Sequence, residues 1–173
     1  MTDRIGYVAL GSNHEPESRH LAFGIAGIAT IGPIVHVSTV YQTKAIGLPG
    51  QPDYLNAVCA FRTTLPPKAL RGHLKAIEQS AGRIPGHHPV TLDLDLCLLG
   101  DLLVASHAVT LPHPDLLTRP ALALGLAELD PTLRHPGTGE TFATIAARLL
   151  ARESAPIARR DIRLLGAGSA PMI

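Results

Sequence analysis

The chain has 173 residues, enough for one ordinary domain with its own core and too few for two. Its formal net charge of +1 and the lack of a polybasic stretch argue against nucleic-acid and membrane-surface partners and favour small molecules. Apolar residues make up 46% of the chain but aromatic residues only 3%, so we expect a core of Leu, Ile, Val and Ala.

The cysteines and the start of the chain bear on the cellular compartment. Cys59 and Cys97 lie in apolar, strand-like runs without CxxC spacing, which is typical of reduced core thiols rather than of a disulfide or a zinc site. Residues 1–13 lack a basic region followed by a long apolar run, so we expect neither a signal peptide nor a membrane span. These features predict a cytoplasmic protein and leave its oligomeric state open.

Hydrophobic periodicity and turn residues predict the elements up to residue 80. A short β-rich run is followed by a turn whose Ser12 or Asn13 we expect to cap the next helix. An alternating β-branched run, a long Gly- and Pro-rich loop, a third strand and a helix that starts near a Pro-Pro pair come next. The predicted strands are residues 5–10, 34–41 and 55–64, the helices 16–31 and 64–80, and the loop 42–54.

Residues 91–99 carry a pattern with chemical meaning. Leucines at alternate positions from 92 to 98 predict one buried face, and Asp93 and Asp95 then share the other face. Same-face neighbours on a strand lie about 7 Å apart, so the two carboxylates repel each other unless a cation lies beside them. Such oxygen ligands suit Mg²⁺, which keeps several waters and completes its shell with substrate phosphates. The strand is a candidate metal platform for phosphate chemistry, and the alternative is an edge strand with two solvated acids.

The predicted order β-α-β-β-α-β is the split βαβ arrangement of ferredoxin-like α+β sandwiches. Beyond Gly100, an irregular turn at 111–115 precedes two additional helices at 119–128 and 142–150. We therefore predict a single domain over residues 1–150. Residues 151–173, which include four arginines, are predicted to be a mobile tail or an interaction arm.

Four motifs in this order resemble the 6-hydroxymethyl-7,8-dihydropterin pyrophosphokinase (HPPK) family. They are Ala9-Leu10-Gly11-Ser12-Asn13, Ser38-Thr39-Val40-Tyr41-Gln42-Thr43, Gln51-Pro52-Asp53-Tyr54-Leu55-Asn56-Ala57, and Thr91-Leu92-Asp93-Leu94-Asp95 followed by Leu111-Pro112-His113-Pro114. The resemblance runs from Tyr7 to about Pro131 and implies a ferredoxin-like fold. It also implies an ATP-dependent transferase of folate biosynthesis, a 2-amino-4-hydroxy-6-hydroxymethyldihydropteridine diphosphokinase.

Carried over residue by residue, the resemblance implies three groups of site residues. Asp93 and Asp95 would hold two Mg²⁺ ions that bridge the pterin hydroxymethyl group and the ATP phosphates, and Arg83 would support the chemistry. The pterin hydroxyl would attack the β-phosphorus of ATP and give pterin diphosphate and AMP. The residues that would line the pterin pocket are Thr43, Ile46, Tyr54 and Asn56. The ATP-side residues are Glu78, Leu96, Thr110, His113 and Arg119.

Three family positions carry different residues here and keep other interpretations open. Val90 and Ala108 stand where the family has arginines, and Ala121 stands where it has an aromatic residue that stacks on the pterin. The candidate replacements for the lost cations are Lys44, His87 and His88. The alternatives are a diverged paralogue with another pterin or phosphate donor, and a non-catalytic pterin or nucleotide binding module. Each site residue by itself also fits a core, turn or solvated surface position.

Overall fold

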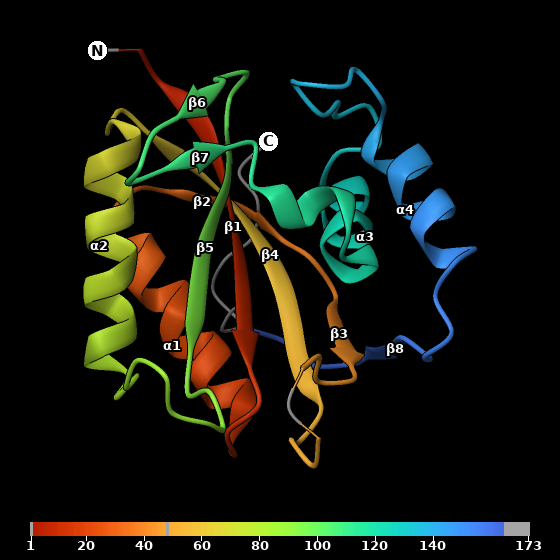
Figure 1. The fold of residues 1–173 in the computed structure, drawn as a ribbon. Coiled ribbons are helices and arrows are strands. Elements are labelled where there is room, and N and C mark those ends of the chain that lie inside the picture. Colours follow the sequence, from red (N-terminus) through yellow and green to blue (C-terminus); the bar gives the residue numbers. More distant parts are fainter. Residues whose placement is uncertain (1, 48, 165–173) are drawn as a thin grey trace.

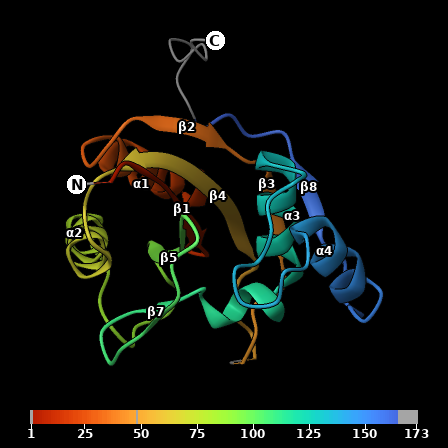
Figure 2. The same ribbon diagram turned by 90° about the horizontal axis from the view of Figure 1, so that it is seen from above.

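A computed structural model describes residues 2–47 and 49–164 of the chain. An antiparallel sheet runs through the middle of the molecule and carries helices on both faces (Figures 1 and 2). In chain order, the elements are β1 (Arg4–Ser12), α1 (Glu17–Ala29), β2 (Ile34–Val37), β3 (Val40–Thr43), β4 (Tyr54–Thr63), α2 (Pro67–Ser80), β5 (Asp93–Leu99), β6 (Val104–Ala105), β7 (Thr110–Leu111), the short 3₁₀ helix η1 (Pro114–Leu117), α3 (Pro120–Leu129), α4 (Phe142–Leu150) and β8 (Ala158–Arg160).

The sheet contains the split βαβ arrangement expected from the sequence and one further strand, β8. Its strands lie in the order β5-β1-β4-β3-β8, and β2 also pairs with β4. β4 is thus inserted between β1 and the β2–β3 run, which is the split βαβ arrangement. The predicted α+β, ferredoxin-like architecture is confirmed. β6 and β7 form a separate two-stranded ribbon next to β5 (Figure 1).

Two sets of helices bury the sheet on both sides (Figure 2). Along β1, Val8 and Leu10 belong to the core that includes α1 and α2, whereas Tyr7 and Ala9 belong to the core that includes α3 and α4. The alternation explains why this strand is apolar at successive positions. The additional helices predicted from the sequence therefore form the third layer. None of the helices in the described part of the chain is long and apolar enough to cross a membrane.

The predicted strand at 34–41 is two strands, because side chains interrupt the pairing at Ser38 and Thr39. Oγ of Ser38 accepts a hydrogen bond from the N–H of Val58 at 2.9 Å, in the place of a ladder carbonyl. The N–H of Thr39 donates to a carboxylate oxygen of Glu128 at 2.9 Å. The alternating sequence continues through both strands, so periodicity does not reveal the break.

The expected cap of α1 by Ser12 or Asn13 is wrong, because both residues are buried in other contacts. The helix begins at Glu17 without a side-chain cap. Oδ1 of Asn13 accepts a hydrogen bond from the N–H of Val90, and its Nδ2 donates to the carbonyl of Pro52 at 3.2 Å. The turn after β1 therefore ties together the loops that precede β4 and β5.

The leucine face of β5 changes sides at a bulge. Leu98 pairs with Tyr7 and Leu96 with Val8, so Cys97 is an extra residue between them. Leu98 packs on the α3–α4 side, whereas Leu96 packs on the α1–α2 side. The predicted alternation is right up to Leu96 and wrong for Leu98.

Part of the predicted C-terminal tail joins the sheet, since residues 158–160 form β8 and pair with β3. Ile162 and Leu164 pack against the α1–α2 core. Residues 151–164 are thus placed on the domain and do not form a free arm, while residues 165–173 lie outside the described part of the chain. The domain limit at residue 150 stays a prediction.

Substitutions at two helix glycines test how closely the helices pack on the sheet. A Cβ added to Gly125 in α3 would lie 2.6 Å from Cγ2 of Val58 on β4, whereas a Cβ added to Gly72 in α2 would meet nothing within 4 Å. We expect Gly125→Ala to lower the free energy of unfolding by about 1 to 3 kcal/mol through overpacking. Gly72→Ala should raise it by about 0.5 to 1 kcal/mol. Denaturant unfolding measures both changes, and changes of the same sign would contradict the close packing of α3 on β4.

Candidate active site

Asp93 and Asp95 are same-face neighbours on β5, the strand at one edge of the sheet (Figure 1). Leu94 between them is 1% exposed and packs in the α1–α2 core. Because side chains alternate along a strand, both carboxylates lie on the opposite face, where they line a cleft with Leu122 of α3. The predicted acid-bearing strand is thus an edge strand, and its acids face a recess rather than open solvent.

Glu78 of α2 holds the backbone of β5 between the two aspartates. Its side chain is buried, and its Oε1 accepts hydrogen bonds from the N–H of Leu94 at 2.6 Å and from Nζ of Lys75 at 2.7 Å. The same lysine nitrogen lies 3.9 Å from a carboxylate oxygen of Asp95. Lys75 therefore offsets part of the negative charge that three neighbouring carboxylates bring together.

The protonation of Asp93 reflects this crowding. Burial and the neighbouring Asp95 carboxylate raise the pKa of Asp93 from an ordinary 3.8 to about 6. The positive charges of Lys75 and Arg83 act in the opposite direction, and the carboxylate of Glu78 adds to the increase. A cation bound between the two aspartates would favour the ionised form of both.

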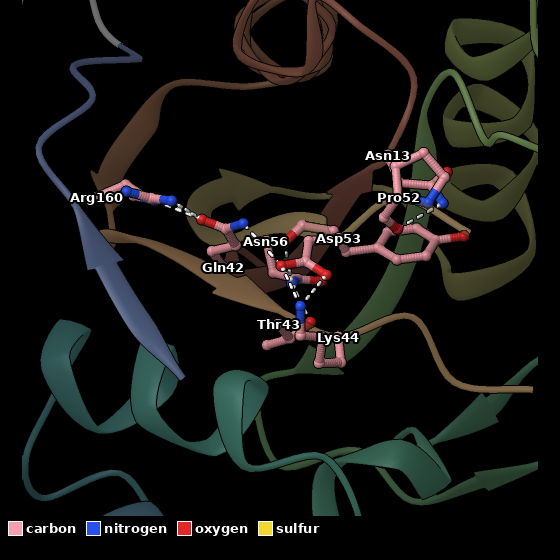
Figure 3. Close-up of polar contacts among 9 residues, drawn as sticks. Asn13, Gln42, Thr43, Lys44, Pro52, Asp53, Asn56 and Arg160 are labelled. Atoms are coloured by element: carbon pink, nitrogen blue, oxygen red, sulfur yellow. Dashed lines mark hydrogen bonds and ion pairs between the residues drawn. The ribbon is translucent and has the colours of Figure 1, made fainter. Parts of the chain in front are cut away.

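A hollow of about 210 Å³, which we call the β3–α3 hollow, opens between the β3–β4 loop, the start of α3 and residues 153–157. The four residues predicted for the pterin pocket all line it: Thr43, Ile46, Tyr54 and Asn56. Nδ2 of Asn56 donates a hydrogen bond to Oγ1 of Thr43 at 3.0 Å, which fixes the orientation of the amide (Figure 3). The structure therefore brings this predicted group together.

A second hollow of about 350 Å³ lies on the other side of Asp95, and we call it the α2–β5 hollow. It is lined by three of the predicted ATP-side residues, Leu96, Thr110 and His113, and by two basic residues of α2, Arg71 and Lys75. Nδ1 of His113 accepts a hydrogen bond from the N–H of Asp115 at 3.3 Å, so the neutral ring carries its proton on Nε2. That nitrogen is a donor.

A narrow space of about 30 Å³, the carboxylate cleft, shares lining residues with both hollows. Asp93 and Asp95 line it together with Tyr54, Asn56 and Arg119. The last three also line the β3–α3 hollow, and Asp95 also lines the α2–β5 hollow. The two carboxylates therefore lie between two binding spaces.

Two predicted ATP-side residues lie outside the α2–β5 hollow. Glu78 lines none of the three spaces and supports β5 instead. Arg119 lines the cleft and the β3–α3 hollow, and its Nε is 2.7 Å from a carboxylate oxygen of Asp115. Arg119 thus shares the cleft with the two aspartates, whereas Leu96 and Thr110 line the α2–β5 hollow.

The loop after α2 carries the predicted catalytic arginine. Nη1 of Arg83 donates hydrogen bonds to the carbonyls of Ile84 at 2.7 Å and His87 at 3.2 Å. Its charge lowers the pKa of Asp93, although it is a smaller influence than burial and Asp95. Val90 is only 3% exposed, so this position offers no side chain to the cleft.

Positive charge at the α2–β5 hollow comes from α2 and not from the candidate replacements in the loops. Lys44 lines the β3–α3 hollow, where its Nζ is 3.0 Å from a carboxylate oxygen of the neighbouring Asp53 (Figure 3). His87 and His88 line none of the three spaces. Arg71 and Lys75 were not predicted as site residues. The i, i+3 spacing of Lys75 and Glu78 on a predicted helix was the available signal.

The donor set at the cleft fits Mg²⁺. The described residues contain no group of three or more His, Cys, Asp or Glu side chains that could hold a metal ion by themselves. The cleft offers two neighbouring carboxylates, and a hard cation that takes its other ligands from water and substrate phosphates suits such a pair. Nitrogen and sulfur ligands, which zinc prefers, do not line the cleft.

The two carboxylates lie between two hollows. This is the layout of a metal-assisted transferase that moves a group from one small molecule to another. Residues 7–131 match the family model for 7,8-dihydro-6-hydroxymethylpterin-pyrophosphokinase (HPPK). The matched range contains both aspartates and most of the residues that line the two hollows. The chain therefore belongs to the HPPK family.

Individual relatives agree with the family match. The 2-amino-4-hydroxy-6-hydroxymethyldihydropteridine pyrophosphokinase of Synechocystis sp. is 39% identical over 139 residues, which cover 78% of this chain and 71% of that protein. The protein of the same name from Haemophilus influenzae is 33% identical over 136 residues, which cover 76% of this chain and 85% of that protein.

A solved structure supports the fold. Wild-type HPPK-DHPS of Plasmodium falciparum, crystallised with pteroate, aligns with a TM-score of 0.68 at 11% sequence identity. The alignment covers 87% of this chain and 45% of the solved chain, so this protein spans less than half the length of that one. At this level of identity the likeness confirms the fold alone.

The raised pKa of Asp93 predicts a pH-dependent stability. At a pH between about 4 and 6 the folded chain holds a proton that the unfolded chain has lost, so the free energy of unfolding falls as the pH rises through this window. Asp93→Asn removes the charge, and in buffer without divalent cations it should melt at a higher temperature than the parent at pH 7.5. The difference should vanish below about pH 4.

Asp101→Asn, at an exposed turn residue, is the matched control and should leave the melting temperature unchanged at either pH. Thermal unfolding followed by circular dichroism makes the comparison. Equal melting temperatures of Asp93→Asn and the parent at pH 7.5 would contradict the charge crowding at the cleft.

Proposed function

We propose that this protein transfers diphosphate from ATP to the hydroxymethyl group of 6-hydroxymethyl-7,8-dihydropterin in folate biosynthesis and releases AMP. The observation that carries the proposal is the position of Asp93 and Asp95 between two hollows of different chemistry. One offers an aromatic ring, an amide and apolar surface, which suit a planar heterocycle. The other offers two basic side chains, which suit a polyphosphate.

The reaction makes one bond and breaks one. The hydroxyl oxygen of the pterin bonds to the β-phosphorus of ATP, and the bond between this phosphorus and the oxygen that bridges it to the α-phosphate breaks. AMP takes the electron pair, and the hydroxyl proton passes to water. Because a transfer of this kind needs little covalent help, the protein contributes mainly position and positive charge.

Asp93 and Asp95 are the proposed magnesium ligands, for two ions as the family resemblance implies. When bound, Mg²⁺ neutralises charge on the phosphate oxygens. Glu78 keeps the spacing of the two carboxylates through its hydrogen bond to the N–H of Leu94. Lys75 lowers the cost of holding the aspartates ionised together before a cation arrives.

The β3–α3 hollow is the proposed pterin pocket. Nδ2 of Asn56 donates to Oγ1 of Thr43 and to the carbonyl of Tyr41, so Oδ1 is the atom that accepts a hydrogen bond from a pterin N–H. The ring of Tyr54 offers a flat face to the heterocycle. Ile46, which is 84% exposed, has apolar surface to bury against it.

The α2–β5 hollow is the proposed ATP site. Leu96 offers an apolar contact for the adenine, while Thr110 and Nε2 of His113 are donors for ribose or phosphate oxygens. Arg119 at the cleft and Arg83 in the adjacent loop are assigned to the transferred phosphates. Together with Lys75 they supply the cations that Val90 and Ala108 do not.

We place the protein in the cytoplasm, where ATP is available and thiols stay reduced. Cys59 and Cys97 are both free and buried, and burial raises the pKa of both thiols, that of Cys59 to about 12. Thiols that stay protonated in an apolar core are unreactive and fit a reducing compartment.

Formation of AMP tests the proposed activity directly. The parent is incubated with 6-hydroxymethyl-7,8-dihydropterin, ATP and Mg²⁺, and AMP is measured by chromatography. Asp95→Asn should lower the rate by about a hundredfold or more, because it removes one carboxylate from the metal site. Asp101→Asn should retain the parental rate. Full activity of Asp95→Asn would contradict the metal role, and binding of both substrates without AMP would favour the non-catalytic module.

Lys75 tests whether α2 supplies the charge that the loops lack. Lys75→Met should raise the KM for ATP by about tenfold, since it removes a cation that lines the α2–β5 hollow. Lys68→Met makes the same substitution at an exposed position of the same helix and should leave the KM for ATP unchanged. Steady-state kinetics at varied ATP concentration measure both KM values. Equal KM values for ATP in the two variants would contradict a role of Lys75 in the ATP site.

A further inference from the structure

Residues 153–157, which we call the C-terminal strap, form one wall of the β3–α3 hollow. The strap follows α4 and leads into β8, beside the strand that carries Thr43 (Figure 1). Three of its residues bring apolar surface to the hollow: Ala155, Pro156 and Ile157. Ile157 is half-buried although the residues around it in the chain are mostly exposed. The side chain of Ile157 is thus partly withdrawn from solvent where the strap lines the hollow.

The strap is anchored at both ends. Before it, Leu149 of α4 is buried in the core on the α3–α4 side. After it, β8 pairs with β3, and the guanidinium of Arg159 donates to Oγ1 of Thr39 at 2.9 Å. The guanidinium of Arg160 donates to Oε1 of Gln42, with Nε at 2.6 Å (Figure 3). The wall is therefore held in place relative to β3, the strand that ends at Thr43.

The hollow carries only a small side chain at the position where the family has a stacking aromatic residue. Ala121, at the start of α3, contributes only a methyl group, and Ile46 is 84% exposed. Leu122 of α3 and Ile157 of the strap are the larger apolar side chains that line the hollow and are at least half-buried. The family match ends at residue 131, so the strap lies outside the part of the chain that the family model describes.

We propose that the strap is part of the pterin-binding pocket and that Ile157 determines the affinity for the pterin ring. This inference rests on the proposed function and deepens it. Ile157 buries its side chain against the heterocycle, while the polar edge of the ring meets Thr43 at the end of β3 and Asn56 at the start of β4. A planar heterocycle gains affinity from apolar contact on its faces, and the missing bulk at Ala121 makes the contact from Ile157 more important.

Kinetics at varied pterin concentration test the role of Ile157. Ile157→Ala should raise the KM for 6-hydroxymethyl-7,8-dihydropterin by about tenfold and leave kcat and the KM for ATP unchanged, because the lost contact is equal in the ground and transition states. Ile157→Val, which keeps the β-branched shape, should raise the same KM by about two- to threefold. The valine variant also serves if the alanine variant does not fold, as judged by thermal unfolding.

Ile162→Ala is the matched control. It makes the same substitution five residues further along, where the side chain lines a different hollow with Asp53 and Leu55, and it should leave the KM for the pterin at the parental value. An unchanged KM for the pterin in both Ile157 variants overturns the inference. An equal rise in the KM values for pterin and ATP also overturns it, because it indicates a general structural role.

If the parent forms no AMP, the proposed function fails and the strap is judged by binding alone. Calorimetric titration of the parent and of Ile157→Ala with 6-hydroxymethyl-7,8-dihydropterin measures pterin binding independently of catalysis. Weaker binding by the variant than by the parent supports the strap as a pocket wall. Equal binding, or no binding to the parent, overturns it.

Discussion

The site depends on holding Asp93 and Asp95 close together on a strand that lies partly away from water. Burial and the repulsion between the two like charges both raise the pKa of Asp93, burial being the larger cause. The core under β5 resists their separation, because Leu94 is buried between them and its N–H is bound by Glu78. A strand fixed from behind in this way cannot relax to relieve the repulsion. The site can still take up a proton, as the raised pKa of Asp93 indicates, or bind a cation.

The position of β5 at the edge of the sheet also determines which element supplies the basic side chains of the site. β5 ends the sheet, so the space beyond it is bounded by α2 on one side and by the ribbon and η1 on the other. Side chains of α2 that reach this space, Arg71 and Lys75, are held on a helix rather than on a loop. A cation on a regular element needs less ordering when a phosphate arrives. The buried Val90 and the small Ala108 are therefore compatible with a charged nucleotide site.

Local pattern predicted the main helices and strands and the two acids of β5, whereas the other candidate site residues came from the family resemblance. Period-two alternation located β5 and its two acids, and helical spacing located the helices. The split at Ser38 and the bulge at Cys97 were missed, because each depends on how side chains and strands pair across the sheet. β8 was missed for a different reason. Its three residues are all exposed, so they leave no hydrophobic pattern, and only the pairing with β3 defines the strand.

The site is built from several chain segments, so binding of the metal and contact with the pterin ring depend on different residues. The carboxylates belong to β5, whereas the walls of the β3–α3 hollow come from the β3–β4 loop, the start of α3 and the strap. A change in a wall residue, such as the small side chain at Ala121, alters contact with the ring without moving β5. Loss of apolar surface there is a loss of uniform binding, which affects the ground state and the transition state alike. The strap can restore that contact from outside the family-matched range because it is attached to β3, next to the pocket, and leaves the two aspartates untouched.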